Sequence, residues 1–283
     1  MRQAIRFFCA LCAACVLAGI LAAQGTTSLN LAAHITPTGG RPEPVRQFTF
    51  YVLTKSYPDI IKEVEAGDVI PTREEFLSKM KASPELRDWM KAHDVMDLTA
   101  PDMDKLVTPN NVMDIPEFFA AYLRANSGGV TNGLPMPKFR ESDKETNPAK
   151  YDKLHNEYLV ALKHFIQTHP ATISGIELEL AGVNPKNQWD KIVGDHKLKV
   201  AQLAPDTAQT KYLAGKAETD LDGRAVVNGL APGNYWVSSL GLDASSGDRR
   251  LRWDVPVGIQ GGQPARIELT NLNGADAHKP FTP

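Results

Sequence analysis

Hydrophobic and polar residues alternate in two short segments near the beginning of the chain. In residues 29–35 and again in residues 48–52, every second residue is apolar, which is the period of a half-buried β-strand. Glycines and prolines at 39–44 separate the two segments and predict a hairpin over residues 28–54. A single hairpin is marginally stable in water, so the pattern also predicts that further strands join it.

The hundred or so residues that follow have the period of helices. Thr72 begins a capping box, and the Ser-Pro pair at 83–84 is typical of a second helix start. Apolar residues at helical spacing predict a third helix around 115–123 and a long fourth one over 151–166. The segment 126–148 is rich in glycine, proline and charge, and it predicts a long surface loop between them.

Strand periodicity returns in residues 173–180 and dominates the last third of the chain. A helix near 185–203 separates the two strand regions and is expected to end near Pro205. From Tyr212 onward, short alternating segments recur at the spacing that is typical of a β-sandwich.

Two turns stand out in the stretch TDLDGRAVVNGLAPGNYWV, residues 219–237. If this stretch were a helix-hand calcium loop with Gly223 at the sixth position, Gly229 would stand at the twelfth, where a bidentate glutamate is required. The acids are therefore interpreted as turn residues. Asp222 and Gly223 predict a hairpin turn, and the Pro-Gly pair at 232–233 predicts a type II turn with its glycine in the left-handed conformation.

The same stretch carries a resemblance to a known family. The segments AETDLDG (217–223) and VNGLAPGNY (227–235) resemble the carboxypeptidase-regulatory-like modules of exported bacterial proteins, and GRPEPV (40–45) is similar to the beginning of that module. The resemblance covers residues 28–54 and 208–272. It implies a transthyretin-like or prealbumin-like sandwich, grouped with carbohydrate-binding-like folds, with a non-catalytic accessory role. The helical material between the two halves departs from a minimal module.

The predicted fold class is therefore α+β, a prealbumin-like antiparallel β-sandwich interrupted by an α-helical insertion. The expected divisions are a signal peptide at 1–24, the first strands of the sandwich at 26–58, the helical insertion at 59–170, the remainder of the sandwich at 171–275 and a tail at 276–283.

The first residues are typical of a secretory signal. Arg2 and Arg6 precede an uncharged apolar run, residues 7–23, whose length of about 17 residues is at the short end for a retained membrane anchor. All three cysteines lie in this run. Cys15 is not expected to be a lipoprotein site, because Cys12 stands where leucine is needed. We expect an exported protein, periplasmic or extracellular, with no cysteine and no stable membrane span after signal cleavage.

Composition and spacing favour a protein that is not an enzyme. The formal net charge of −2 without a basic stripe argues against a nucleic-acid partner. Asp152 and His155 lie three apart on the long helix, but His164 is a further nine residues along, on the opposite side, so no metal site is expected. Glu177 and Glu179 would lie about 7 Å apart on one strand face, which we interpret as solvated. No cofactor is expected.

Three residues are candidates for ligand binding: Trp236, Arg250 and Arg252. Strand alternation places Tyr235 and Val237 on the core face and Trp236 on the other, where its ring could stack on a sugar. Alternatively, Trp236 packs beneath the insertion. The two arginines project outward from a strand, either as contacts for an anionic glycan or partner protein or as solvated charges.

These patterns predict an exported, non-enzymatic binding or structural module of the bacterial cell envelope. The expected partner is a glycan or an envelope protein, and carbohydrate binding is the sharper form of this hypothesis. The alternative is a hydrolase with a site between the helical insertion and the sandwich.

Overall fold

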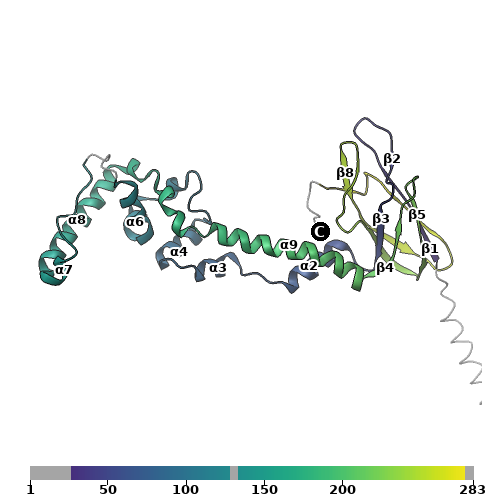
Figure 1. Ribbon diagram of the computed structural model, residues 1–283, viewed down its shortest axis with the longest axis horizontal. Coiled ribbons are helices and arrows are strands. Elements are labelled where there is room, and N and C mark those ends of the chain that lie inside the picture. Colours follow the sequence, from purple (N-terminus) through teal and green to yellow (C-terminus); the bar gives the residue numbers. More distant parts are fainter. Residues whose placement is uncertain (1–26, 128–132, 278–283) are drawn as a thin grey trace, which may run out of the picture. The chain divides into compact units, whose positions relative to one another are not determined.

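The computed structural model describes residues 27–127 and 133–277 of the chain (Figure 1). The predicted signal peptide, residues 1–24, lies outside the described residues. The chain divides into two compact units: a strand unit, made of the residues up to Val69 and from His196 onward, and a helical unit, Ile70–Asp195. The sequence placed the helical insertion at 59–170 instead. The protein is a mixed α/β chain with several antiparallel sheets.

The first sheet of the strand unit is built around β1 (Thr27–Ile35). This strand pairs antiparallel with β5 (Arg224–Leu230) on one side and parallel with β10 (Ala265–Leu269) on the other, and its end also pairs with the short β2 (Glu43–Pro44). Its burial alternates without a break, as its sequence period predicted.

The second sheet has four strands, all antiparallel to their neighbours. Their order is β4 (Leu213–Glu218), β3 (Thr49–Leu53), β6 (Gly233–Ser238) and β9 (Asp254–Ile259).

A third, three-stranded sheet completes the strand unit. Its order is β11 (Ala275–Asp276), β8 (Arg249–Arg252) and β7 (Ala244–Ser246). The expected tail at 276–283 thus begins within a strand, and its residues 278–283 lie outside the described part of the chain.

Buried side chains from both four-stranded sheets form one hydrophobic core. Trp253, between β8 and β9, is fully buried in it; its ring lies edge-on to Phe50 with centroids 5.7 Å apart, and its Nε1 donates to the Thr270 carbonyl at 3.0 Å. The other fully or almost fully buried members include Leu29, Leu31, Ala33, Ile35, Val52, Val227, Leu230, Val237, Ile259 and Leu269.

The predicted hairpin over residues 28–54 forms only in part. The end of β1 pairs antiparallel with β2, but β3 belongs to the second sheet and does not pair with β1. Leu31 lies opposite Ile267 on one side and Ala225 on the other, so distant strands occupy both edges of β1. Alternation in a sequence predicts which side chains are buried, but it carries no information about which strand pairs with which.

The turns of residues 219–237 also connect the two sheets, and the predicted hairpin there is wrong. Asp220, not Asp222, closes the first turn: its carboxylate accepts from the backbone N–H groups of Asp222 and Arg224 at 2.9 and 2.8 Å. Gly223 has a φ of 74°, and a Cβ there would lie 2.5 Å from the Ala33 carbonyl oxygen, so only glycine fits. At the second turn the left-handed residue is Gly229, not the predicted glycine at 233.

Two helices pack in the strand unit. The helix α2 (Tyr57–Gly67) and the C-terminal part of α9 (Lys186–Lys211) bury a small second core. Its buried members are Leu53, Tyr57, Ile60, Ala204, Ala208 and Leu240. The predicted break near Pro205 is wrong: α9 continues through it, and the buried alanines at 204 and 208 flank the proline. Burial of that face offsets the one backbone hydrogen bond that a proline removes.

The helical unit contains short helices around a separate core. Thr72 and Glu75 form the predicted capping box at its first helix, with each side chain accepting from the other residue's backbone N–H. The helices are α3 (Arg73–Lys79), α4 (Pro84–Ala92), α5 (Pro109–Asp114), α6 (Pro116–Ala125), α7 (Asp143–Thr146) and α8 (Pro148–Thr168), with the 3₁₀ helices η1 (Met103–Leu106), η2 (Pro170–Ile173) and η3 (Ile176–Val183).

The strand predicted over residues 173–180 is wrong, because η3 occupies most of that segment. Ile176 and Leu180 are both fully buried and stand four residues apart, a spacing that fits a helical face as well as one face of a strand. Consequently Glu177 and Glu179 do not share a strand face. Glu179 instead accepts from Arg124 Nε at 3.0 Å.

Candidate functional site

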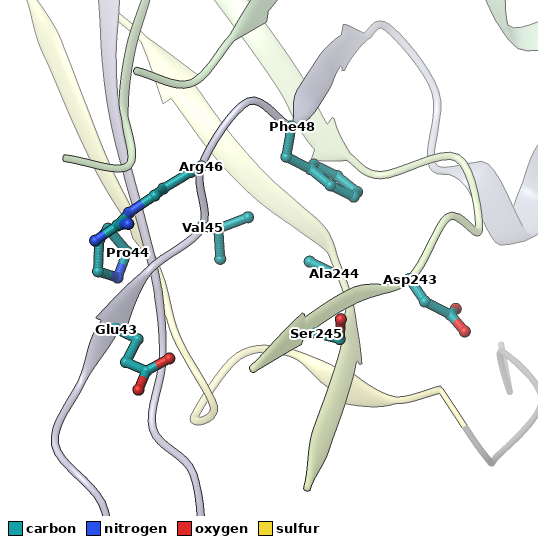
Figure 2. Close-up of a pocket in the computed structure, with 8 residues that line it drawn as sticks. All are labelled: Glu43, Pro44, Val45, Arg46, Phe48, Asp243, Ala244 and Ser245. Atoms are coloured by element: carbon teal, nitrogen blue, oxygen red, sulfur yellow. The ribbon is translucent and has the colours of Figure 1, made fainter. Parts of the chain in front are cut away.

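An open hollow of about 630 Å³ lies within the strand unit (Figure 2). One wall is the segment that runs from β2 to the beginning of β3, and the other is the segment that leads into β7. The lining residues are Glu43, Pro44, Val45, Arg46, Phe48, Asp243, Ala244 and Ser245. Its volume is within the range of small-molecule sites.

A buried threonine holds the first wall in place. Thr219 Oγ1 donates to the Val45 carbonyl at 2.6 Å and accepts from the Phe48 N–H at 3.0 Å. Between these two residues Gln47 adopts a left-handed φ of 51° and donates its N–H to the Thr219 carbonyl at 3.0 Å. The loop is therefore fixed by a residue more than 170 positions away in the sequence.

Two carboxylates line the hollow, and each accepts a bond from a neighbouring side chain. Asp243 is ion-paired with Arg252 Nε, and Glu43 accepts from the Ser246 hydroxyl. A carboxylate has two oxygens with about four acceptor positions in total, so each group retains capacity to accept from a ligand hydroxyl.

Phe48 supplies an apolar surface to this polar hollow. The ring is partly buried and packs on Phe50, with centroids 5.0 Å apart. Figure 2 shows Phe48 and Val45 directed toward the segment that carries Ala244, whereas the side chain of Arg46 points to the opposite side of its own segment. The hollow thus combines an aromatic ring with hydrogen-bond acceptors.

Trp236 lies in the second sheet, away from this hollow's lining. It stands on β6 between Leu53 of β3 and Pro256 of β9, and it is partly buried. Its neighbours Tyr235 and Val237 belong to the core, so the predicted alternation at these positions is confirmed. Trp236 faces the same side of the sheet as Leu53, which packs with α2 and α9.

The two candidate arginines occupy β8 and do not line the hollow, but Arg252 is ion-paired with a residue that does. Arg250 is exposed. Arg252 is partly buried and ion-paired with Asp243, so it orients a carboxylate of the lining rather than standing free. Sequence reasoning missed Phe48 and Asp243 as site residues, because no local pattern joins segments 200 positions apart. Glu43 was noted only within a motif for the fold.

Asp254 is a second feature that the sequence did not reveal. Burial raises the pKa of Asp254 to about 6, although hydrogen bonds from the Tyr57 N–H and the Ser238 side chain act to lower it. The Tyr57 bond, 3.1 Å long, places this carboxyl at the first turn of α2. Burial likewise raises the pKa of the Tyr57 hydroxyl to about 12.

Within residues 27–127 and 133–277, no group of three or more histidine, cysteine, aspartate or glutamate side chains is arranged to hold a metal ion. No helix in this described part has the length and apolar character to cross a membrane.

Comparisons with protein-family models, curated proteins and solved structures found no match. The resemblance to carboxypeptidase-regulatory-like modules therefore rests on the sequence motifs alone.

Proposed function

We propose that the protein is an exported, non-enzymatic binding module of the bacterial cell envelope, and that its ligand is a carbohydrate. The hollow beside β7 carries this proposal. Carboxylate oxygens such as those of Glu43 and Asp243 accept hydrogen bonds from sugar hydroxyls, and an aromatic face such as that of Phe48 packs on the apolar face of a sugar ring.

The specific fold that we propose is a prealbumin-like antiparallel β-sandwich with an α-helical insertion. Two four-stranded sheets share one hydrophobic core, which supports a sandwich. The chain leaves this unit at Val69 and rejoins it at His196, which supports an insertion. Export is proposed from the charged and apolar pattern of the first 24 residues.

Among the residues first singled out, Arg252 takes an indirect role. Its ion pair orients the Asp243 carboxylate at the edge of the hollow. Trp236 and Arg250 are candidates for a separate contact with a glycan or an envelope protein.

The alternative function is a hydrolase. A glycoside hydrolase needs two carboxyl groups that flank the bond to be cleaved, and Glu43 and Asp243 line the same hollow. This pair lies within the strand unit rather than between the insertion and the sandwich. In a hydrolase, prolonged incubation with a bound oligosaccharide would yield shorter products by mass spectrometry.

A glycan array, followed by polysaccharide pull-down, tests the proposal. The purified protein should retain at least one glycan, and the variants Phe48→Ala and Glu43→Gln should lose it while Trp236→Ala keeps it. Loss in Trp236→Ala alone would move the site to the second sheet. Retention of no glycan would contradict carbohydrate binding, and cleavage of the retained glycan would favour the hydrolase.

A further inference from the structure

The first sheet carries a second depression on the face that points away from the core. Its volume is about 540 Å³, and its floor is the central strand β1. Alternation along β1 sends Leu29, Leu31 and Ala33 into the core and turns the intervening side chains outward. The lining residues are Asn30, Leu31, Ala32, His34, Arg224, Ala225, Val226, Arg266, Ile267 and Glu268.

Strand register places these outward side chains in two rows across three strands. In one row Asn30 lies between Arg266 of β10 and Val226 of β5. In the next row Ala32 lies between Glu268 and Arg224. The small Ala32 side chain leaves the middle open. The two arginines stand on opposite flanks, with Cα atoms about 12 Å apart by strand geometry.

Both arginines are exposed and available to a ligand. In the described part of the chain, the arginines that form ion pairs with carboxylates are Arg73, Arg124, Arg249 and Arg252. Neither Arg224 nor Arg266 forms an ion pair with a carboxylate within residues 27–127 and 133–277, and both are exposed. A guanidinium group binds a carboxylate through two parallel hydrogen bonds, so each arginine can hold one carboxylate of a ligand.

The remaining groups select among anionic ligands. The Asn30 amide both donates and accepts hydrogen bonds, and the Glu268 carboxylate accepts them. These two groups can bind hydroxyl groups of a ligand that lie between the carboxylates held by the arginines. Duplex DNA carries one phosphate per about 1.7 Å of helix axis, a much denser array of charge than two arginines on opposite flanks of the depression can match. A polysaccharide that contains uronic acids carries both widely spaced carboxylates and many hydroxyls.

We propose that the outer face of β10, β1 and β5 binds an acidic polysaccharide, with Arg224 and Arg266 each binding one carboxylate. This surface is separate from the hollow lined by Phe48, and the proposal goes beyond the function proposed above because it names a second site and a charged ligand class. It does not depend on a ligand in the hollow.

Isothermal titration with an oligogalacturonate tests the proposal. The control ligand is the fully methyl-esterified oligomer of equal length, which lacks the carboxylate charges. The charged oligomer should bind and the ester should not, and binding should weaken as salt rises. Arg224→Gln with Arg266→Gln should reduce affinity by at least about tenfold. The control double variant, Arg41→Gln with Arg249→Gln, removes two positive charges outside the depression and should leave the affinity unchanged.

Asn30→Asp gives a second, nearly isosteric test, because it places a negative charge on the floor of the depression. It should also weaken binding while circular dichroism and the melting temperature confirm folding, and Phe48→Ala should have no effect. The proposal is overturned if the ester binds equally well, if the two double variants lose affinity equally, or if no oligogalacturonate binds. Charge-dependent binding of DNA or anionic vesicles, but not of oligogalacturonate, would also overturn it.

Discussion

The strand unit and the helical unit build their cores from very different sequence distances. In the strand unit β1 pairs with β5 and β10. The backbone N–H of Thr36 donates to the side-chain oxygen of Asn271, 235 positions away, and the Asn271 amide donates back to the Thr36 carbonyl. The core of the helical unit comes from one continuous segment, Ile70–Asp195. Long-range pairing makes the strand unit dependent on contacts across the whole chain, whereas the helical unit depends on local ones. This difference predicts that they respond differently to mutation and pH.

The largest expected effect is that of Trp253→Ala in the strand unit. The indole is fully buried, packs on Phe50 and donates to the Thr270 carbonyl. Truncation should lower the free energy of unfolding by about 4 kcal/mol. Urea unfolding followed by circular dichroism measures the loss.

Phe118→Ala is the matched change in the helical unit, because Phe118 is also fully buried and its ring lies edge-on to Trp89. We expect a loss of about 3 kcal/mol. Hydrogen exchange should rise within the strand unit for Trp253→Ala and within the helical unit for Phe118→Ala. Equal acceleration in both units for either variant would show that they unfold as one.

The next effect concerns pH. Because the folded pKa of Asp254 is about 6, above the ordinary 3.8, the folded state keeps a proton that the unfolded state releases. Its stabilising contribution is complete below pH 3.8 and is lost as pH rises to about 6, a change on the order of 3 kcal/mol. Asp254→Asn should remove this dependence in urea unfolding between pH 4 and pH 7.

Asp97 of the helical unit should show the opposite sign. Burial acts to raise the pKa of Asp97, but hydrogen bonds from Thr99 and Asn184 together lower it below its ordinary value. Its contribution is therefore present above pH 3.8 and is lost as pH falls below that value. Asp97→Asn should flatten the acid limb of the stability profile. An Asp254→Asn variant that kept the wild-type profile from pH 4 to pH 7 would contradict this contrast.

A smaller effect is expected from single hydrogen bonds. Thr219→Val removes the hydroxyl that bonds the Val45 carbonyl and the Phe48 N–H, and should cost about 2 kcal/mol. It should also weaken glycan binding, because it loosens a wall of the hollow.

The local counterpart in the helical unit is Thr72→Ala, which removes an N-cap and should cost about 1 kcal/mol. Thr72→Ala should leave glycan affinity unchanged in a titration. Equal effects of the two threonine variants on affinity would refute the role assigned to Thr219.

The smallest effect is expected for a surface carboxylate. Hydrogen bonds from Lys211, Lys55 and Tyr212 lower the pKa of Glu63 to about 2. Its contribution is present above pH 4.5 and is lost as pH falls toward 2. Glu63→Gln should lower the melting temperature at pH 6 to pH 8, where this contribution is complete, and should lower it progressively less as pH falls toward 2. A melting temperature that fell equally at all pH values would contradict the electrostatic origin.

The sequence was sufficient to predict burial where burial depends on neighbours in the chain. The alternation in β1 and around Tyr235 is confirmed, as is the capping box at Thr72. Pairing was not predictable, because the partners of β1 are separated from it by about 200 residues. The segment with Ile176 and Leu180 was misassigned because a spacing of four fits both a strand face and a helix face.

The candidate site was less predictable than the fold. Phe48 and Asp243 line the same hollow only in the folded chain, and neither residue belongs to a pattern with chemical meaning. Arg252 was identified as an outward charge, but its partner Asp243 could not be inferred. Arg224 and Arg266 likewise acquire a common surface only through β1.

Hydrogen exchange of the purified protein, with and without a glycan retained in the pull-down, tests the central claim most directly. The account predicts slower exchange in residues 43–48 and 243–245 of the strand unit, with the glycan left intact and exchange in the helical unit unchanged. Protection confined to residues 70–195, or cleavage of the glycan during the experiment, would contradict it.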